Sequence, residues 1–261
     1  MVRAHGRAHD QLRPIKIHYD VIDYAAASLL YEQGKTKVLC TITLQNNVPP
    51  FLKGKKTGWL NAEYAMLPTA THIRKERDNS LHKPNGRSVE ISRLIGRAFR
   101  SIIDLSKLDE RTIIIDCDVI QADGSTRTAG ITGSFLALQC AVDRWLKSGK
   151  LTQNIIREEL AAVSLGVINN DILLDLDFSE DSIINADFNF IMTKSGNIVE
   201  IQGSAEKHPI SWDSIEKMHK LAFQGISTIF QTVEKQSSTP APVPIKVPFN
   251  GIRIRSDQST K

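Results

Sequence analysis

The stretch TIIIDCDVIQADGSTRTAG, from Thr112 to Gly130, decides the fold of this chain. Its apolar and β-branched first half predicts a buried strand over Thr112–Gln121. A glycine-rich turn is expected over Ala122–Gly130, and the length and Ala/Leu content of Thr132–Leu146 predict a helix. The polar residues of the turn therefore lie where a strand feeds into a helix.

Further strands and a helix are predicted on the N-terminal side of this stretch. Alternating apolar residues over Pro14–Asn46, with a turn at Gly34, indicate strands, and Trp59–Leu67 is a further apolar segment. A long polar loop follows from Thr69 to Arg87. Ser88 is then expected to cap an amphipathic helix, whose apolar residues repeat at three-and-four spacing: Ile91, Leu94, Ile95, Ala98, Phe99, Ile102 and Ile103.

The second half of the chain loosely repeats this order of strands and helix. Strands are expected at 162–168, 172–176, 188–193 and 198–202, and Ser211 is expected to cap a last helix. We therefore predict an α+β fold, in which residues 1–235 form a single domain of two pseudo-duplicated sheet-and-helix halves. The Pro/Ser-rich composition of residues 236–261 predicts a disordered tail.

Composition and charge exclude several classes of protein. The 261 residues are 41% hydrophobic, which suffices for a packed core. No apolar run is long enough to span a membrane and the N-terminus lacks the apolar centre of a secretory signal, so a cytoplasmic location without membrane contact is expected. The net charge is only +4, yet one short stretch is strongly basic. Its basic residues are Arg74, Lys75, Arg77, Lys83, Arg87, Arg93, Arg97 and Arg100.

Two segments have the composition of an anion-binding site. Gly86-Arg87-Ser88 stands at a helix start, and Gly124-Ser125-Thr126-Arg127-Thr128 lies between a strand and a helix. Helix N-termini offer unpaired amides and a partial positive charge, and an arginine adds a fork of donors, a combination that suits inorganic phosphate. The alternative is that Gly124 only makes a turn and Arg127 is a surface charge.

An acidic cluster is the second candidate site. It runs through Asp175, Asp177, Glu180 and Asp181 and continues at Asp187. Converging carboxylates can hold a hard divalent cation such as magnesium, although a solvated acidic loop is the alternative. No metalloprotease helix, P-loop or convincing Ser-His-Asp order accompanies the cluster.

Several motifs, in order along the chain, resemble the ribonuclease PH family. They are Gly6-Arg7, Asp10-Gln11-Leu12-Arg13-Pro14, Glu63-Tyr64-Ala65-Met66-Leu67-Pro68, Gly86-Arg87, Arg93-Leu94-Ile95-Gly96-Arg97-Ala98, Asp116 to Gly124, Thr126-Arg127-Thr128-Ala129, Asp175-Leu176-Asp177, Glu180-Asp181-Ser182, Asp187 and Glu200 to Glu206. The resemblance spans about Arg7 to Lys235. So many motifs in one order make it highly specific.

The resemblance implies roles for individual residues. Arg87, Gly124, Ser125, Thr126 and Arg127 are expected to bind phosphate. Asp181 and Asp187 are the expected catalytic carboxylates, working with Mg²⁺ (or Mn²⁺), and Arg74 and Arg77 are expected to receive RNA. Thr69 replaces an arginine usual in the RNA-binding loop, which would remove one phosphate contact. His5 replaces a usual aspartate.

The resemblance also implies the reaction and its partners. We expect a phosphate-dependent 3′→5′ exoribonuclease that trims transfer RNA precursors and other RNA 3′ ends, releases nucleoside diphosphates and runs in both directions. Inorganic phosphate is then a co-substrate, and the expected assembly is a homohexamer, a trimer of dimers. Two alternatives remain: a non-catalytic RNA-binding subunit of an exosome-like ring, or the active subunit of such a ring.

Overall fold

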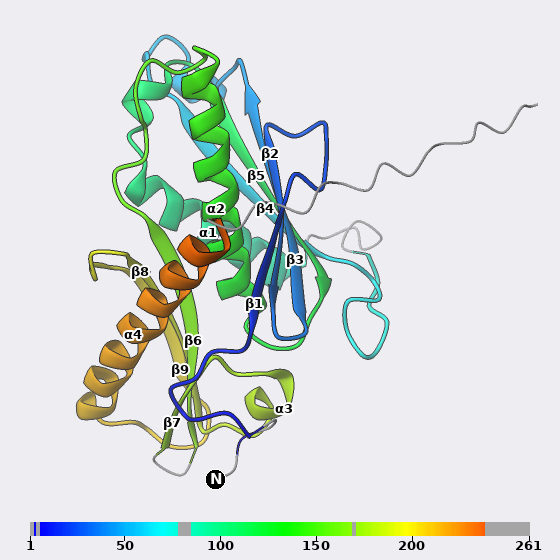
Figure 1. The fold of residues 1–261 in the computed structure, drawn as a ribbon, viewed down its shortest axis with the longest axis vertical. Coiled ribbons are helices and arrows are strands. Elements are labelled where there is room, and N and C mark those ends of the chain that lie inside the picture. Colours follow the sequence, from blue (N-terminus) through cyan, green and yellow to red (C-terminus); the bar gives the residue numbers. More distant parts are fainter. Residues whose placement is uncertain (1–2, 4–5, 78–84, 169–170, 238–261) are drawn as a thin grey trace, which may run out of the picture.

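The computed structural model describes residue 3 and residues 6–77, 85–168 and 171–237. The expected tail lies, from residue 238 onward, outside the described residues, as does His5. Within these described ranges the fold contains two β-sheets and four α-helices, which confirms the predicted α+β class (Figure 1).

The first sheet contains the N-terminal strands. These are β1 (Ile15–Tyr19), β2 (Ala27–Gln33), β3 (Thr36–Gln45), β4 (Trp59–Met66) and β5 (Thr112–Gln121). Their order in the sheet is β1-β2-β3-β5-β4, and only the β4 and β5 pair is parallel within this sheet. Alternate residues of β3 are buried, as expected for a sheet with one face on the core.

The second sheet is antiparallel and has the order β7-β6-β8-β9. Its strands are β6 (Leu160–Ile168), β7 (Asp171–Leu174), β8 (Ala186–Thr193) and β9 (Ile198–Ala205). Every residue of β6 is buried, because one face of this strand meets α2 and the other meets α4. The second sheet has four strands and the first has five.

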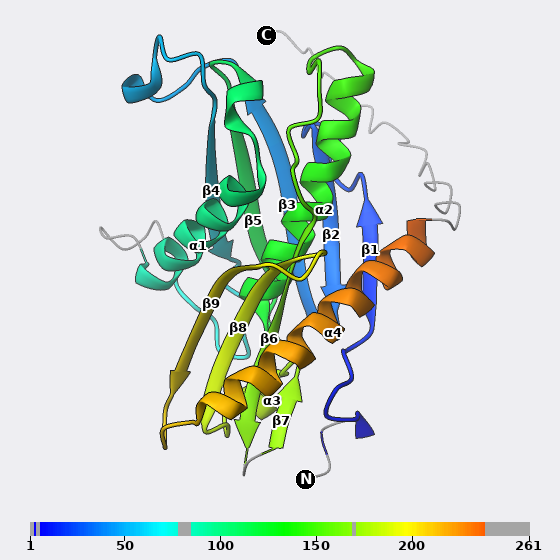
Figure 2. The ribbon, with the colours of Figure 1, turned by 90° about the vertical axis from the view of Figure 1, so that its left-hand side faces the viewer.

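The helices fill and cover the space around the sheets. They are α1 (Gly86–Ile102), α2 (Thr126–Lys147), α3 (Phe178–Asp181) and α4 (Trp212–Ser237), with 3-10 turns at Pro50–Leu52 and Leu105–Leu108. Helix α2 contacts β2, β3 and β5 on one side and β6 on the other, so it lies between the sheets (Figure 2). One continuous core therefore joins side chains of both halves, Leu29, Phe135 and Phe190 among them.

Several predicted boundaries differ from the structure: strands β6 and β8 begin two residues earlier than expected, and β9 ends three residues later. Three further differences have an identifiable local cause. Helix α2 begins at Thr126 instead of Thr132, because Ser125 already takes the left-handed conformation that ends the turn. Asn85, not Ser88, caps α1: its side chain accepts a hydrogen bond from the Arg87 amide at 3.0 Å, and Asn and Ser are equally good caps. Strand β7 ends at Leu174, before a left-handed Asp175.

The predicted cap of the last helix is confirmed in its contacts. The Ser211 hydroxyl oxygen accepts a hydrogen bond from the Ser214 amide at 3.3 Å.

In the described part of the chain, none of the helices has the length and apolar character needed to cross a membrane.

Candidate active site

The starts of two helices and the two central strands of the second sheet line a pocket of about 90 Å³. Arg87 comes from the first turn of α1, and Thr126 and Arg127 from the first turn of α2. Asp181 and Asp187 come from α3 and β8. The complete lining is Arg87, Ser125, Thr126, Arg127, Ser164, Leu165, Leu176, Asp181, Asp187, Phe188 and Asn189. Of the predicted phosphate-binding and catalytic residues, only Gly124 is absent from this lining.

The turn before α2 is held against the second sheet. Gly124 has a φ of +76°, and a Cβ there would lie 2.4 Å from the Leu176 carbonyl oxygen, so only glycine fits. The Ser125 hydroxyl donates to the same Leu176 carbonyl at 2.8 Å and lies 2.6 Å from the Ser164 hydroxyl. Since its hydroxyl is engaged in this way, Ser125 has its backbone amide to offer to an anion.

The guanidinium of Arg127 is held in place from two directions. Its Nη1 atom donates to Gln202 Oε1 at 2.9 Å and to Glu90 Oε1 at 3.1 Å. Gln202 in turn donates to Glu200 at 3.3 Å, and Glu200 is held by Arg97 at 2.6 Å. This series of contacts between α1 and β9 presets the direction of the Arg127 side chain, which lowers the entropy it would lose on binding an anion.

The acidic cluster of the sequence separates into two groups. Asp177 caps α3, where its Oδ1 accepts from the Ser179 and Glu180 amides, and Glu180 closes the capping box. Both Nε and Nη2 of Arg3 donate to Glu180 at 2.8 Å, and Arg7 donates to the same carboxylate at 2.9 Å. Arg7 Nη2 also lies 3.6 Å from Asp177 Oδ2. The N-terminal segment therefore neutralises both Asp177 and Glu180, which makes them unsuited to a metal.

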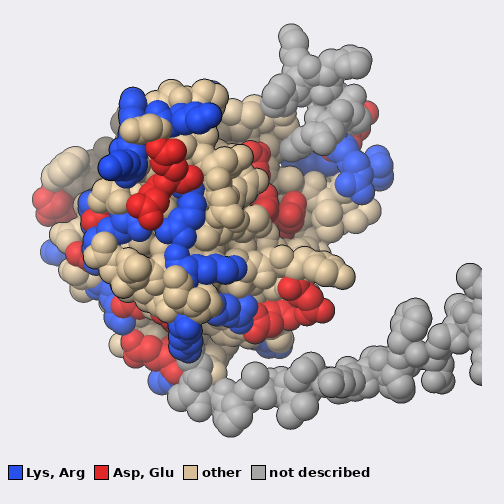
Figure 3. All heavy atoms as spheres, turned by 90° about the horizontal axis from the view of Figure 1, so that it is seen from above, with Lys and Arg blue, Asp and Glu red and all other residues tan. Residues whose placement is uncertain are grey.

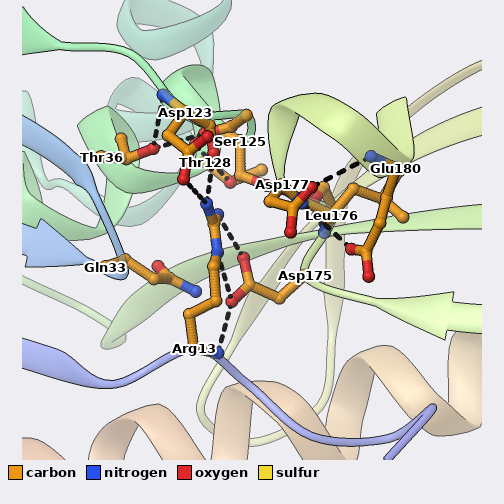
Figure 4. Close-up of polar contacts among 12 residues, drawn as sticks. Arg13, Gln33, Thr36, Asp123, Ser125, Thr128, Asp175, Leu176, Asp177 and Glu180 are labelled. Carbon is orange, nitrogen blue, oxygen red and sulfur yellow. Dashed lines mark hydrogen bonds and ion pairs between the residues drawn. The ribbon is translucent and has the colours of Figure 1, made fainter. Parts of the chain in front are cut away.

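Asp175, like Asp177 and Glu180, is paired with an arginine of the N-terminal segment (Figure 4). Its carboxylate accepts from Arg13 Nε at 3.0 Å, from Nη2 at 2.6 Å and from the Arg13 amide at 2.7 Å. Burial alone would raise the pKa of the Asp175 carboxyl, but the charge and hydrogen bonds of Arg13 hold that pKa below its ordinary value. Arg13 also donates to the Asp123 carbonyl oxygen, so it connects the end of β7 to the turn that leads into α2.

Asp181 and Asp187 remain on the pocket wall. Partial burial raises the pKa of the Asp181 carboxyl, and the negative charge of Asp187 raises it further. The charges of Arg87 and Arg127 act in the opposite direction. The pocket thus sets a pair of mutually repelling carboxylates opposite two cations.

The predicted RNA-binding arginines lie apart from the pocket. Arg74 and Arg77 are exposed on the segment that follows β4, as is Thr69. On the face seen from above, basic and acidic side chains are interspersed (Figure 3). Neither arginine lines the pocket, so any contact with RNA would be made outside it.

The residue patterns did not single out Tyr64, Ser164, Asn189 and Gln202 individually. Tyr64 lies beneath the α2 start, Ser164 and Asn189 line the pocket, and Gln202 holds Arg127. Tyr64 and Gln202 stand within motifs of the resemblance, which is the one signal that could have indicated them. Their neighbours in space come from distant segments, so local pattern alone carries no such information.

Comparisons with known proteins cover both sheets and the whole pocket. Residues 11–142 match domain 1 of the 3′ exoribonuclease family, and residues 159–225 match domain 2. Ribonuclease PH of Neisseria meningitidis serogroup C is 53% identical over 226 residues, which is 87% of this chain and 93% of the relative. Ribonuclease PH of Neisseria gonorrhoeae strain NCCP11945 is 52% identical over the same shares.

Solved structures share the fold at low sequence identity. Rice (Oryza sativa) Rrp46 has a TM-score of 0.73 at 16% identity, over 90% of this chain and 99% of that one. A chain of the Archaeoglobus fulgidus exosome with RNA bound to the active site has a TM-score of 0.72 at 20% identity, over 88% and 92%. Because both family domains and relatives of 53% identity span the pocket, the chain belongs to the 3′ exoribonuclease family, with the ribonucleases PH as its relatives.

Proposed function

We propose that the chain carries out the reaction of the ribonuclease PH family in the pocket between α1, α2 and β8. The reaction is the phosphate-dependent removal of nucleotides from the 3′ end of transfer RNA precursors and other RNA. The single observation that carries this assignment is the pairing of two arginines at helix starts with two carboxylates around one small cavity. The enzyme would meet its RNA in the cytoplasm.

Inorganic phosphate would bind at the basic side of the pocket. Arg87 and Arg127 supply charge, Thr126 supplies a hydroxyl, and the first amides of α2 have no acceptor within the helix. Gly124 lets the turn approach the second sheet closely, so that Ser125 and Thr126 face the cavity. Together these groups would screen the repulsion between the phosphate anion and the phosphodiester it attacks.

Asp181 and Asp187 fit a divalent cation. Two carboxylates, completed by water and phosphate oxygens, are a usual protein contribution to a Mg²⁺ site, and Mn²⁺ accepts the same ligands. Among the described residues, no third Asp, Glu, His or Cys joins them to form a larger group. The negative charge of Asp187 helps to raise the pKa of Asp181, and a cation bound between the two carboxylates would offset this repulsion. When bound, the ion would supply Lewis-acid stabilisation of the charged oxygens.

The reaction then follows from this arrangement. An oxygen of inorganic phosphate forms a new bond to the last phosphorus of the RNA, and the bond from that phosphorus to the 3′ oxygen of the preceding ribose breaks. The 3′ oxygen takes up a proton, and a nucleoside diphosphate leaves. Since the bonds broken and formed are alike, an excess of nucleoside diphosphate should drive nucleotide addition instead.

A test of this function measures the dependence of the reaction on phosphate. Purified protein is incubated with Mg²⁺ and an RNA that has a short single-stranded 3′ end, with and without inorganic phosphate, and the released nucleotides are identified. Nucleoside diphosphates released only with phosphate are expected. Monophosphates released without phosphate would mean hydrolysis, and RNA binding without any release would mean a non-catalytic subunit.

Replacement of Arg127 should weaken the use of phosphate more than the use of RNA. For Arg127→Ala, we expect the KM for phosphate to rise by about 10- to 100-fold, since hydrogen bonds to charged groups contribute roughly 1.5–3 kcal/mol. The KM for RNA should change by less than about threefold, and steady-state kinetics at varied phosphate and RNA measure both. Arg157→Ala, which removes an exposed arginine far from the pocket, serves as the matched control. An unchanged KM for phosphate would contradict this assignment.

RNA approaching the pocket would first meet the exposed loop that carries Arg74 and Arg77. Both arginines can contact the phosphates of a single strand, while Thr69 offers no charge there. We also propose a homohexamer, a trimer of dimers, as the working assembly, because the structural relatives include chains of an exosome. In such a ring, neighbouring subunits would add arginines to the same RNA path.

A further inference from the structure

The side chain of Tyr64, on β4, contacts the first residue of α2. The side chain is 4% exposed, and its hydroxyl donates a hydrogen bond of 2.9 Å to Thr126 Oγ1. Thr126 is itself 5% exposed and lines the pocket beside Arg127. The buried end of the Tyr64 ring thus touches one of the groups expected to bind phosphate, while Tyr64 itself stays outside the cavity.

The hydrogen bond from Tyr64 restricts the direction in which the Thr126 hydroxyl can donate its proton. A threonine hydroxyl has one proton and two acceptor lone pairs. The Tyr64 hydroxyl donates into one lone pair of Thr126 Oγ1. The proton of the Thr126 hydroxyl must therefore point away from Tyr64. Within the part of the chain that the structure describes, the Thr126 hydroxyl donates to no acceptor.

Other threonines of α2 behave differently. Thr128 donates to the Ser125 carbonyl oxygen at 2.9 Å, and Thr132 donates to the Ala162 carbonyl oxygen at 3.4 Å. Helical threonines commonly use their proton in this way on nearby backbone oxygens. Thr126 stands at the first position of the helix and, among the described residues, makes no such bond to a backbone oxygen.

We propose that Tyr64 is a positioning residue of the phosphate site, which turns the proton of the Thr126 hydroxyl toward an oxygen of inorganic phosphate. The inference rests on the proposed function, because it takes phosphate to be the anion in the pocket. Without the Tyr64 hydroxyl, the Thr126 hydroxyl can rotate away, and the donor is no longer aligned before phosphate arrives.

The surroundings of Tyr64 keep it a donor. Burial raises its pKa to about 12, although the bond to Thr126 and the charges of Arg87 and Arg127 act against the rise. The phenol therefore remains protonated throughout the pH range in which the enzyme would work.

The first test is Tyr64→Phe, which removes the hydroxyl and leaves the buried ring. We expect the KM for phosphate to rise about fivefold to tenfold, as for the loss of one aligned hydrogen bond, with kcat and the KM for RNA within about twofold of wild type. The matched control is Tyr31→Phe, which removes another buried tyrosine hydroxyl, bonded to Gln33 at 3.2 Å and outside the pocket. It should leave the KM for phosphate unchanged.

A double-mutant cycle separates positioning from simple packing. Thr126→Val should raise the KM for phosphate, and adding Tyr64→Phe to it should cause no further rise, because the two hydroxyls act as one unit. The proposal is overturned if Tyr64→Phe leaves the KM for phosphate unchanged, or if its effect multiplies with that of Thr126→Val. The rise in melting temperature on adding inorganic phosphate reports binding without turnover, and it should shrink in both single variants.

These outcomes are distinct from failure of the proposed function. If wild-type protein releases no diphosphates with phosphate present, the function and this inference fall together. If wild type is phosphate-dependent and Thr126→Val is impaired while Tyr64→Phe is normal, only the role of Tyr64 is lost.

Discussion

Asp181→Asn and Asp187→Asn should each lower kcat for phosphorolysis by about 10²- to 10³-fold, the usual effect of removing a preorganised electrostatic group from an active site. Each amide keeps the size of the side chain but loses the charge that would hold a divalent cation. The KM for phosphate should change little, because Arg87, Thr126 and Arg127 are untouched. Initial rates of diphosphate release at saturating Mg²⁺ measure the effect.

The design includes a control for charge alone. Asp143→Asn removes an exposed carboxylate near the C-terminal end of α2, far from the pocket at its N-terminal end, and should keep wild-type rates. Mg²⁺ titration adds a second readout, since the aspartate variants should need more Mg²⁺ for half-maximal activity. Retention of more than about a third of wild-type kcat in both variants would remove these carboxylates from the mechanism.

Arg13→Met should lower the free energy of unfolding by about 3–5 kcal/mol, the range found when one partner of a buried ion pair is removed. Asp175 is 1% exposed and would be left charged without its partner. The substitution also frees the turn at Asp123, so the phosphate site should become less ordered. Urea denaturation at neutral pH, followed by circular dichroism, measures the change.

An exposed ion pair provides the comparison. Arg144 donates to Asp20 at 2.6 Å, but these side chains are 42% and 58% exposed, so Arg144→Met should cost no more than about 1 kcal/mol. Replacing the buried pair together, with Arg13→Met and Asp175→Leu, should recover part of the loss because no charge remains buried. Equal costs for Arg13→Met and Arg144→Met would show that the buried pair has no special role.

The ion pair between Arg13 and Asp175 also predicts how the stability of the folded chain changes as the pH falls. The pKa of Asp175 is lower in the folded chain than its ordinary value of about 3.9. Its contribution to stability is therefore fully present above that ordinary value and is lost as the pH falls through the lower, folded-state pKa. Arg13→Met should reduce this acid-dependent loss, which urea midpoints measured between neutral and strongly acidic pH would detect.

Much of the fold follows from short-range patterns. The β-branched run of Thr112–Gln121 and the glycine at Gly124 predict strand and turn, and the apolar stripe beginning at Ile91 predicts α1, because periodicity and turn chemistry act over a few residues. The same patterns place Arg87 and Arg127 near helix starts. They leave helix boundaries uncertain, since Asn85 and Ser88 are equally good caps and the helix before Thr132 looks like a turn.

The separation of the acidic cluster required tertiary structure. Residues alone do not distinguish Asp175 from Asp181, which stand in one short polar run, and only the family resemblance favoured Asp181 and Asp187. In the folded chain Arg13, 162 residues away, neutralises Asp175, and Arg3 and Arg7 neutralise Glu180. Among the described residues, these arginines contact Asp175, Asp177 and Glu180, whereas Asp181 and Asp187 line the pocket.

By itself, then, the sequence determined the elements, the α+β class and the residue types at the helix starts, because these depend on neighbours along the chain. Tertiary structure alone decided that α2 lies between the sheets, that Gln202 holds Arg127 and that Tyr64 bonds to Thr126. Such partners are set by strand order and by the packing of distant segments, which bring side chains within hydrogen-bond distance only after the core has formed.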